Sequence, residues 1–366
     1  ETVYLVYNTQ TQDMGSSEKS RYITQLQYEL RRINPGIQIT EEIISLPPPQ
    51  ARPPQTISIT KTPEIIDRLL AVAEKGFSPS ALGLYITCPL QFYLSRVARL
   101  EESETVEETI DASTMGTVIH GVLEEMYRPF TGKELHPENI VHISRDVDRL
   151  TNEQFGIHYP QGDIKNGKNL LLFHLARQYV STFLTAEKRF VEEAAVRGMP
   201  VRLIALEKWL EAGIKVEMGG KPRDISIRGK ADRIDSLGDT TRIIDYKTGK
   251  VPDNELKFDQ WEEVTKNSRN GKAFQLLTYA WLYHKMYPGT PSIEPGIASM
   301  RSANKGVLTL KLPEGKGTLN AGHLAAFEES LMSLLGEIMD PDAAFTQTED
   351  ETNCAYCPYK VMCRRV

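Results

Sequence analysis

Hydrophobic residues along this chain recur with two different periods, and these periods separate expected helices from expected strands. Apolar residues that return every three or four positions predict amphipathic helices, whereas alternating or continuous apolar runs bounded by turn residues predict strands. The helical pattern covers residues 22–30, 115–127, 165–196, 272–287 and 321–338. Two further helices are expected to start at Thr62-Pro63 and Ser78-Pro79, where proline follows a capping hydroxyl. The strand pattern covers residues 3–7 and 37–44 and the block 201–248.

Proline marks a division near the N-terminus. Pro47-Pro48-Pro49 and Pro53-Pro54 form a stiff segment that follows a short stretch of mixed helix and strand character. We therefore expect residues 1–60 to hold a small α/β segment and a proline-rich linker. Residues 61–366 are then expected to form one larger domain.

Composition places the chain among globular proteins without naming a partner. Of its 366 residues, 40% are hydrophobic and 25% are charged, which is ordinary for a folded domain. No apolar run approaches the roughly 18–20 residues of a membrane span, and no signal peptide is visible, so we expect a cytoplasmic protein. The net charge of −6 argues neither for nor against nucleic acid, because a local basic patch decides such binding. The chain starts with Glu1 instead of Met, and we expect a fragment from the C-terminal part of a longer protein.

The stretch 227–249 carries the most specific chemistry. Gly238-Asp239 has the composition of a tight hairpin turn between two runs of apolar and β-branched residues. A turn centred there sets Asp232 opposite Asp245, and Lys247 shares a face with Asp245 because side chains alternate along a strand. Two carboxylates beside a lysine predict a site for a hard divalent cation and a phosphodiester.

Two questions about this hairpin stay open from the sequence. The same register sets Lys230 opposite Lys247, which is unfavourable, so a bulge or a slip is an alternative to regular pairing. Glu207, in the first strand of the block, is either an acid near the site or a surface residue. A solvated hairpin edge with ordinary surface charges is the alternative to a functional site.

Three residues on expected helices are further candidates for the site. His120 lies in the 115–127 helix, and Gln275 and Tyr279 are four positions apart, so they share one helix face. An imidazole could serve as a metal ligand. The alternative for His120 and Tyr279 is ordinary packing in the core, where such residues are commonly found.

The four cysteines predict a second metal site. Cys354, Cys357 and Cys363 follow a C-x2-C-x5-C pattern, and Cys88 lies far upstream. Four thiolates suit zinc or a [4Fe–4S] cluster, and the count alone does not separate the two. A single C-x2-C knuckle with one remote partner favours the cluster, in a structural role that closes a very long loop. Four unconnected thiols are the alternative.

Together these residues resemble the RecB-like branch of the PD-(D/E)XK nuclease superfamily, and the cysteines resemble its iron–sulfur subgroup, which includes the nuclease domains of AddB-type helicase–nucleases. The resemblance runs from about residue 77 to the C-terminus. Besides the hairpin it rests on Ser78-Pro79-Ser80, Tyr85-Ile-Thr-Cys88-Pro89, Met115-Gly-Thr-Val-Ile-His120 and Asn353-Cys-Ala-Tyr-Cys-Pro-Tyr359. The N-terminal piece, with Ser20-Arg21-Tyr22, more weakly resembles the tail of a helicase-like domain.

The resemblance implies a fold and a set of roles. The fold would be an α/β restriction-endonuclease-like core, a mixed sheet flanked by helices. His120, Asp232, Asp245 and the backbone carbonyl of Tyr246 would bind Mg²⁺ or Mn²⁺. Asp232, Asp245 and Lys247 would be catalytic, with Lys247 acting on the attacking water or on the phosphate charge.

The remaining positions of the pattern have implied roles as well. Gln275 and Tyr279 would line the active site and touch DNA. The cluster would be held by Cys88, Cys354, Cys357 and Cys363. We therefore expect a metal-dependent DNA nuclease, an exonuclease on DNA ends or single strands, in double-strand break repair with a helicase partner. The alternative is a catalytically silent scaffold that binds DNA ends or docks a helicase and keeps a structural Fe–S or zinc site.

Overall fold

A computed structural model of the chain describes residues 2–6, 20–42, 56–100, 109–160, 162–218, 220–315 and 317–365. The chain divides into two compact units, residues 1–55 and 56–366. The sequence placed this boundary at residue 60, and the assignment of the first unit to a helicase-like domain stays a prediction.

The regular secondary structure described in the first unit is helical. Its helical run consists of α1 (Arg21–Gln25), the π-helical η1 (Leu26–Leu30) and α2 (Arg31–Ile33). The strands expected at 3–7 and 37–44 are wrong for residues 3–6 and 37–42, which belong to no strand in the described part of the chain. A strand needs a hydrogen-bonded partner to form. Tyr7, Ile43, Ile44 and the prolines of the expected linker lie outside the described residues.

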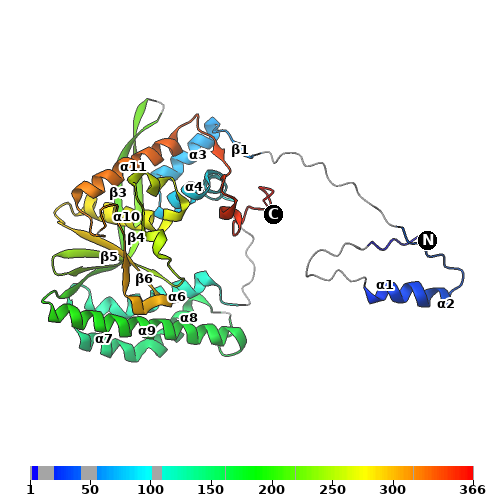
Figure 1. The fold of residues 1–366 in the computed structure, drawn as a ribbon, viewed down its shortest axis with the longest axis horizontal. Helices are drawn as coiled ribbons and strands as arrows, with labels where there is room; N and C mark the ends of the chain where they lie inside the picture. Colours follow the sequence, from blue (N-terminus) through cyan, green and yellow to red (C-terminus); the bar gives the residue numbers. More distant parts are fainter. Residues whose placement is uncertain are drawn as a thin grey trace. The chain divides into compact units, whose positions relative to one another are not determined.

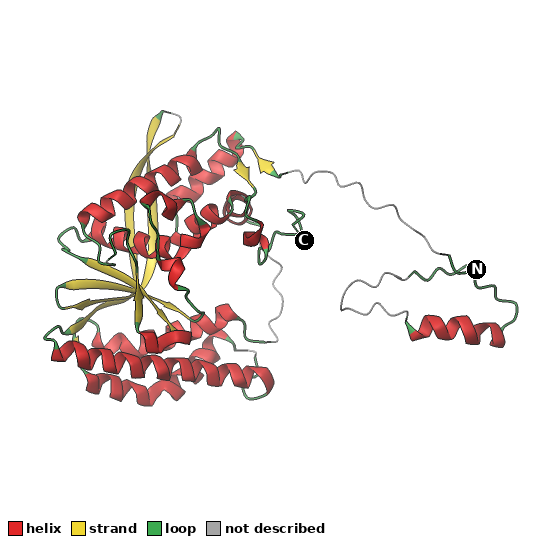
Figure 2. Ribbon diagram, viewed as in Figure 1, coloured by secondary structure: helices red, strands yellow, loops and turns green. Residues whose placement is uncertain are grey.

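The second unit is built around a six-stranded mixed sheet (Figures 1 and 2). In spatial order the strands are β2 (Glu134–Leu135), β3 (Val201–Met218), β4 (Lys221–Leu237), β5 (Thr240–Lys247), β6 (Ile293–Ser299) and β7 (Val307–Thr309). Neighbours are antiparallel except β5 and β6, which are parallel and joined through helix α10 (Gly271–Met286). A second sheet pairs β1 (Ser58–Ile59) with β8 (Phe345–Thr346).

Helices cover both faces of the large sheet (Figure 1). One layer holds α6 (Ala112–Tyr127), α7 (Pro137–Ile143), α8 (Val147–His158) and the long α9 (Gly167–Val196). The other holds α3 (Pro63–Glu74), α4 (Pro79–Thr87), α10 and α11 (Ala321–Met339). The expected α/β core, a mixed sheet flanked by helices, is therefore confirmed.

Shorter elements connect these layers. They are α5 (Pro89–Phe92), η2 (Tyr93–Val97), η3 (Arg128–Phe130), η4 (Ser144–Asp146), η5 (Asp253–Leu256), η6 (Trp261–Thr265), η7 (Ser268–Asn270), η8 (Met300–Lys305) and η9 (Glu351–Cys354).

The central strands are buried on both faces, which is why they read as continuous apolar runs. In β5, Ile243 packs into the core under α10 and α11, whereas Ile244 packs into the core under α6, α8 and α9. Ile297 and Ala298 of β6 divide in the same way. A polar group at the end of β5 therefore lies between two helical layers, each of which can supply side chains to it.

Lys61 joins the start of this unit to its last long helix. Its buried ammonium donates hydrogen bonds to the carbonyl oxygens of Ile338 (2.8 Å), Asp340 (2.7 Å) and Glu337 (3.3 Å) at the end of α11. These carbonyls have no partner within the helix, and a cation at a helix C-terminus is favourable. Burial lowers the pKa of Lys61 to about 8, so the group is charged at neutral pH.

We expect Lys61→Met to lower the free energy of unfolding by about 2 kcal/mol, because it removes the donor of these three carbonyls, of which that of Ile338 is buried. Urea denaturation at pH 7 measures the loss as a shift of the midpoint. Lys305→Met, at an exposed lysine, is the matched control and should leave the midpoint unchanged. An equal effect of the two substitutions would contradict this role of Lys61.

Candidate active site

The β4–β5 hairpin has the register that the sequence predicted. Leu237 pairs with Thr240 across the Gly238-Asp239 turn, and the ladder continues to Arg233 and Ile244. Gly238 has a φ of 57°, a left-handed conformation that suits glycine in such turns. Asp232 and Asp245 are the next residues after the last pair of the ladder.

The two strands separate beyond that point, and this resolves the conflict between Lys230 and Lys247. There β4 pairs with β3, and Ile227 forms a bridge with Phe77 instead of with β5. The ammonium of Lys230 lies 2.6 Å from Glu207, and that of Lys247 lies 2.8 Å from Asp245. Each lysine thus has its own carboxylate.

An imidazole and two carboxylates gather where the strands separate. Nδ1 of His120 lies 3.6 Å from Oδ1 of Asp232 and 4.0 Å from Oε1 of Glu207. One ligand atom from each of the three residues lies within 4.8 Å of the others. Glu207, whose place the sequence left open, therefore lies in the site.

Glu207 reaches the site through an irregular turn of β3. Its φ is 47°, in the left-handed region that residues other than glycine rarely adopt. The register of β3 against β4 shifts between Leu203 and Ala205, just before this residue. Strained backbone of this kind concentrates at functional sites, and here it directs a carboxylate toward His120.

The backbone of Tyr246 fixes the ring of His120. Nε2 of His120 lies 3.0 Å from the Tyr246 carbonyl oxygen, which can only accept, so Nε2 carries the hydrogen. Nδ1 then faces the two carboxylates. The Tyr246 N–H donates to Oδ2 of Asp232 (2.7 Å). A histidine held through one nitrogen with the other facing acids is the arrangement of metal-binding histidines.

Asp245 is held from the other helical layer. Gln275 of α10 donates from Nε2 to Oδ1 of Asp245 (3.0 Å) and to the hydroxyl of Tyr279 (3.3 Å).

Burial raises the pKa of Asp245 to about 6; Lys247 lowers it, and the Asp232 carboxylate adds to the rise. Burial also raises the pKa of Glu207. Burial opposes protonation of His120, yet the neighbouring acids, Asp232 above all, raise its pKa. Negative charge is in excess here, as in a cation site.

Gly229 allows Tyr279 of α10 to pack closely against β4. A Cβ at position 229 would lie 2.7 Å from a ring carbon of Tyr279 and 3.2 Å from Pro79. The first distance is too short for any real Cβ contact and the second is tight, so a larger residue would displace the ring of Tyr279. The glycine three residues before Asp232 is thus explained by packing around Gln275 and Tyr279.

A buried charge network supports the hairpin from behind, and sequence reasoning missed it. Arg233 lies 2.7 Å from Glu187 of α9 and 2.6 Å from Asp235, and Arg242 donates to Asp235 at 2.7 and 2.8 Å. Arg233 also lies over the ring of Tyr127 at 4.9 Å. The alternation of Asp232-Arg233-Ile234-Asp235 was a signal for it, because residues 233 and 235 face away from 232. The network ties the strand of Asp232 to α9.

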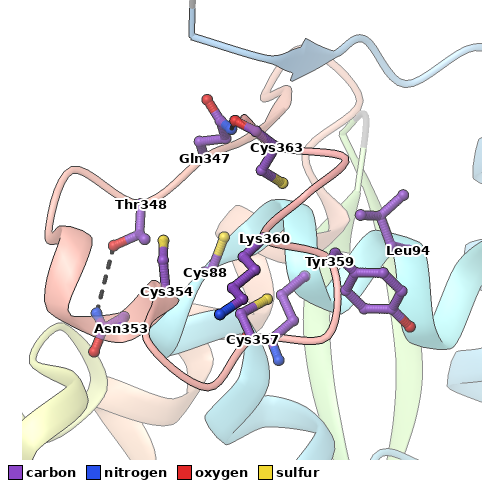
Figure 3. A pocket seen from close by; sticks show the side chains of 11 residues that line it. Cys88, Leu94, Gln347, Thr348, Asn353, Cys354, Cys357, Tyr359, Lys360 and Cys363 are labelled. Carbon is purple, nitrogen blue, oxygen red and sulfur yellow. Dashed lines mark hydrogen bonds between the residues drawn. The ribbon is translucent and has the colours of Figure 1, made fainter. Parts of the chain in front are cut away.

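The four cysteines line one pocket near the C-terminus (Figure 3). Cys88 lies between α4 and α5, because Pro89 starts a new helix. Cys354, Cys357 and Cys363 come from the end of η9 and the turns after it. Burial first, and then the proximity of the other three sulfur atoms, raises the pKa of Cys354. The fold thus brings Cys88 to the three C-terminal cysteines, from which it is distant in the sequence.

Comparison with known proteins agrees with this geometry. The sequence profile of the PD-(D/E)XK nuclease superfamily matches residues 76–364. The chain belongs to this superfamily. The matched range includes the hairpin, the four cysteines and the group of His120, Glu207 and Asp232, which we call the acid cluster. It excludes the N-terminal unit.

A curated relative matches part of the chain. The chain is 26% identical over 220 residues to an ATP-dependent helicase/deoxyribonuclease subunit of Carboxydothermus hydrogenoformans. The match covers 56% of this chain and 18% of the relative, so the chain spans less than a fifth of that protein. The solved structure "Crystal structure of SSO0001" matches with 14% identity over 75% of this chain and 94% of that one, but its TM-score of 0.22 carries no argument. Among the described helices of the PD-(D/E)XK nuclease, none is long and apolar enough to cross a membrane.

Proposed function

We propose that this chain is a deoxyribonuclease that depends on Mg²⁺ or Mn²⁺ and acts as an exonuclease on DNA ends or single strands. The observation that carries the proposal is the meeting of His120, Glu207 and Asp232 beside the Asp245–Lys247 pair. The name of the helicase/deoxyribonuclease relative supports a helicase subunit or domain as partner. Double-strand break repair in the cytoplasm is the setting that we propose with it.

The donor set fits a hard divalent cation. His120 through Nδ1, the carboxylates of Asp232, Asp245 and Glu207, and the second lone pair of the Tyr246 carbonyl would hold it. Oxygen ligands suit Mg²⁺, and the imidazole nitrogen favours Mn²⁺. When bound, the ion would make water more acidic and neutralise charge on the phosphate.

The side chains around it have separate tasks. Lys247, a third exposed and held by Asp245, places positive charge where the phosphorus gains an oxygen during in-line attack. Gln275 orients the Asp245 carboxylate. The Tyr246 N–H orients Asp232, and its carbonyl orients the His120 ring. None of these groups has to move far for the reaction, because the protein already fixes them.

Digestion of end-labelled single- and double-stranded DNA with Mg²⁺ or Mn²⁺ tests the function. We expect progressive shortening from the ends with either ion and none after chelation with EDTA. Folded protein that leaves both DNA forms intact with both ions would overturn the proposal and leave the DNA-binding scaffold as the alternative.

Glu207 gives a sharper test of the donor set. We expect Glu207→Gln to raise the Mn²⁺ concentration for half-maximal cleavage about tenfold or more, because a charged ligand is lost while the side chain keeps its size. Titration of the cleavage rate and calorimetry of Mn²⁺ binding both measure it. Glu211→Gln, four residues further along β3, is the matched control. Equal Mn²⁺ dependence of the two variants would exclude Glu207 as a ligand.

We further propose that Cys88, Cys354, Cys357 and Cys363 hold a [4Fe–4S] cluster, with zinc as the weaker candidate. Their shared pocket supports a four-thiolate site. The cluster would be structural, since it joins the end of α4 to the C-terminal segment and lies in a pocket lined by different residues from those of the acid cluster.

A further inference from the structure

An open groove of about 400 Å³ lies next to the acid cluster. Its walls come from the end of α3 and the first turn of α4 at residues 72 and 75–81, from η2 at residue 96, from β3 and β4 at residues 209 and 228–230, and from α10. Gln275 and Tyr279 belong to this lining, and Gln275 is also the residue that holds Asp245. The groove therefore leads to the proposed catalytic carboxylate.

The charge of the groove is opposite to that of the whole chain. The chain has a net charge of −6, yet the lining includes Lys75, Arg96, Arg228 and Lys230 and no acidic residue. Lys230 is paired with Glu207. Within the described part of the chain, the other three have no carboxylate at ion-pair distance, and all three are exposed. Such a set of unpaired cations suits a polyanion.

Trp209 adds an aromatic surface to these cations. Its side chain is 59% exposed, and it lies opposite Lys230 in the β3–β4 ladder. The Arg228 guanidinium lies 5.7 Å from its ring centroid. An exposed indole beside cations is the combination with which proteins hold unpaired bases and their phosphates, since the base stacks on the ring and the cations follow the backbone.

We propose that this groove holds an unpaired DNA strand, with a base stacked on Trp209 and phosphates at Arg228, Lys75 and Arg96. The inference rests on the proposed function, because the strand would be the substrate of the neighbouring site. A paired base cannot offer its face to Trp209, so the groove selects single-stranded over double-stranded DNA. Trp209 and the three cations would thus determine the preference of the enzyme for single strands.

Binding without divalent ions tests the groove independently of cleavage. Fluorescence anisotropy with a labelled twelve-thymidine strand gives the dissociation constant at several salt concentrations. We expect Trp209→Ala to weaken binding about fivefold or more at every salt concentration, and Trp209→Phe to restore most of it. Arg228→Gln should also lower the slope of log K against log salt by about 0.7, the share of one phosphate contact on a single strand.

Controls separate the groove from general surface charge. Arg145→Gln, an exposed arginine outside the groove, should leave both affinity and slope unchanged. Binding of a blunt duplex should not respond to Trp209→Ala. An effect of Trp209→Ala on duplex as large as on single strand, or none on either, would overturn the proposal. Tighter binding of an RNA strand of the same length would overturn the assignment to DNA.

A small phosphodiester distinguishes failure of the groove from failure of the catalytic proposal. Methyl p-nitrophenyl phosphate is a phosphodiester without a nucleobase or a second phosphate, so it cannot occupy the groove as a strand does. With Mn²⁺, parent and Trp209→Ala should hydrolyse it equally, while Trp209→Ala degrades long single strands more slowly. Loss of ester hydrolysis in Trp209→Ala would mean that the site itself is damaged. No hydrolysis by the parent would count against the proposed function and leave the binding result standing.

Discussion

Replacing Lys247 with alanine is expected to lower the rate of DNA cleavage by at least about 100-fold, while DNA binding changes little. Lys247 carries a positive charge beside the carboxylates that would hold the metal, and it lies 2.8 Å from Asp245. Its contribution is made where negative charge develops on the phosphate, so its loss affects the transition state more than the bound substrate. Single-turnover digestion of end-labelled single strands with saturating Mn²⁺ measures the rate without product release.

Lys250→Ala is the matched control, because this lysine is three residues further on and exposed. It should cleave at the parent rate. The binding assay with the twelve-thymidine strand shows whether Lys247→Ala has merely lost its substrate. If Lys247→Ala kept more than a tenth of the parent rate at full occupancy, the catalytic role of this residue would have to be abandoned.

The hairpin was predictable because residues close together in the sequence determine it. Gly238-Asp239 specifies a two-residue turn, and the turn fixes the register of every pair up to Arg233 and Ile244. The long helices were predictable for a similar reason, since α9 and α11 each keep one periodic pattern between clear ends. The N-terminal strands were not, because a strand depends on a partner that its own sequence does not reveal.

Glu207 shows why the proposed metal ligands were only partly predictable. No motif surrounds it, and its approach to His120 depends on an irregular β3 and a left-handed backbone. The network of Arg233, Asp235 and Arg242 had a signal in the alternation along β4, but its partner Glu187 was not predictable, since α9 meets the hairpin only in three dimensions. The sequence does not show which distant elements meet in the fold, and the proposed active site lies where such elements meet.

The second large effect is expected from Cys88→Ser. This substitution should remove bound iron and sulfide and lower the melting temperature by about 10 °C. In the loop-closure description, a link between Cys88 and Cys354 closes about 266 residues and stabilises the folded state by up to about 5 kcal/mol. For a protein of this size, that corresponds to a shift of about 10 °C. Calorimetry and iron and sulfide analysis of anaerobically purified protein measure the two effects together.

Tyr356→Ala is a control within the same loop, because this side chain is 99% exposed, and it should keep both iron and melting temperature. If the parent protein contained one equivalent of zinc and no iron, the four cysteines would be assigned to a zinc site instead of a cluster. Full iron content in Cys88→Ser would exclude Cys88 as a ligand of the cluster.

Loss of the cluster should also weaken binding of the single strand, because Cys88 adjoins α4, whose first turn lines the groove. Hydrolysis of the small ester should persist below the melting temperature.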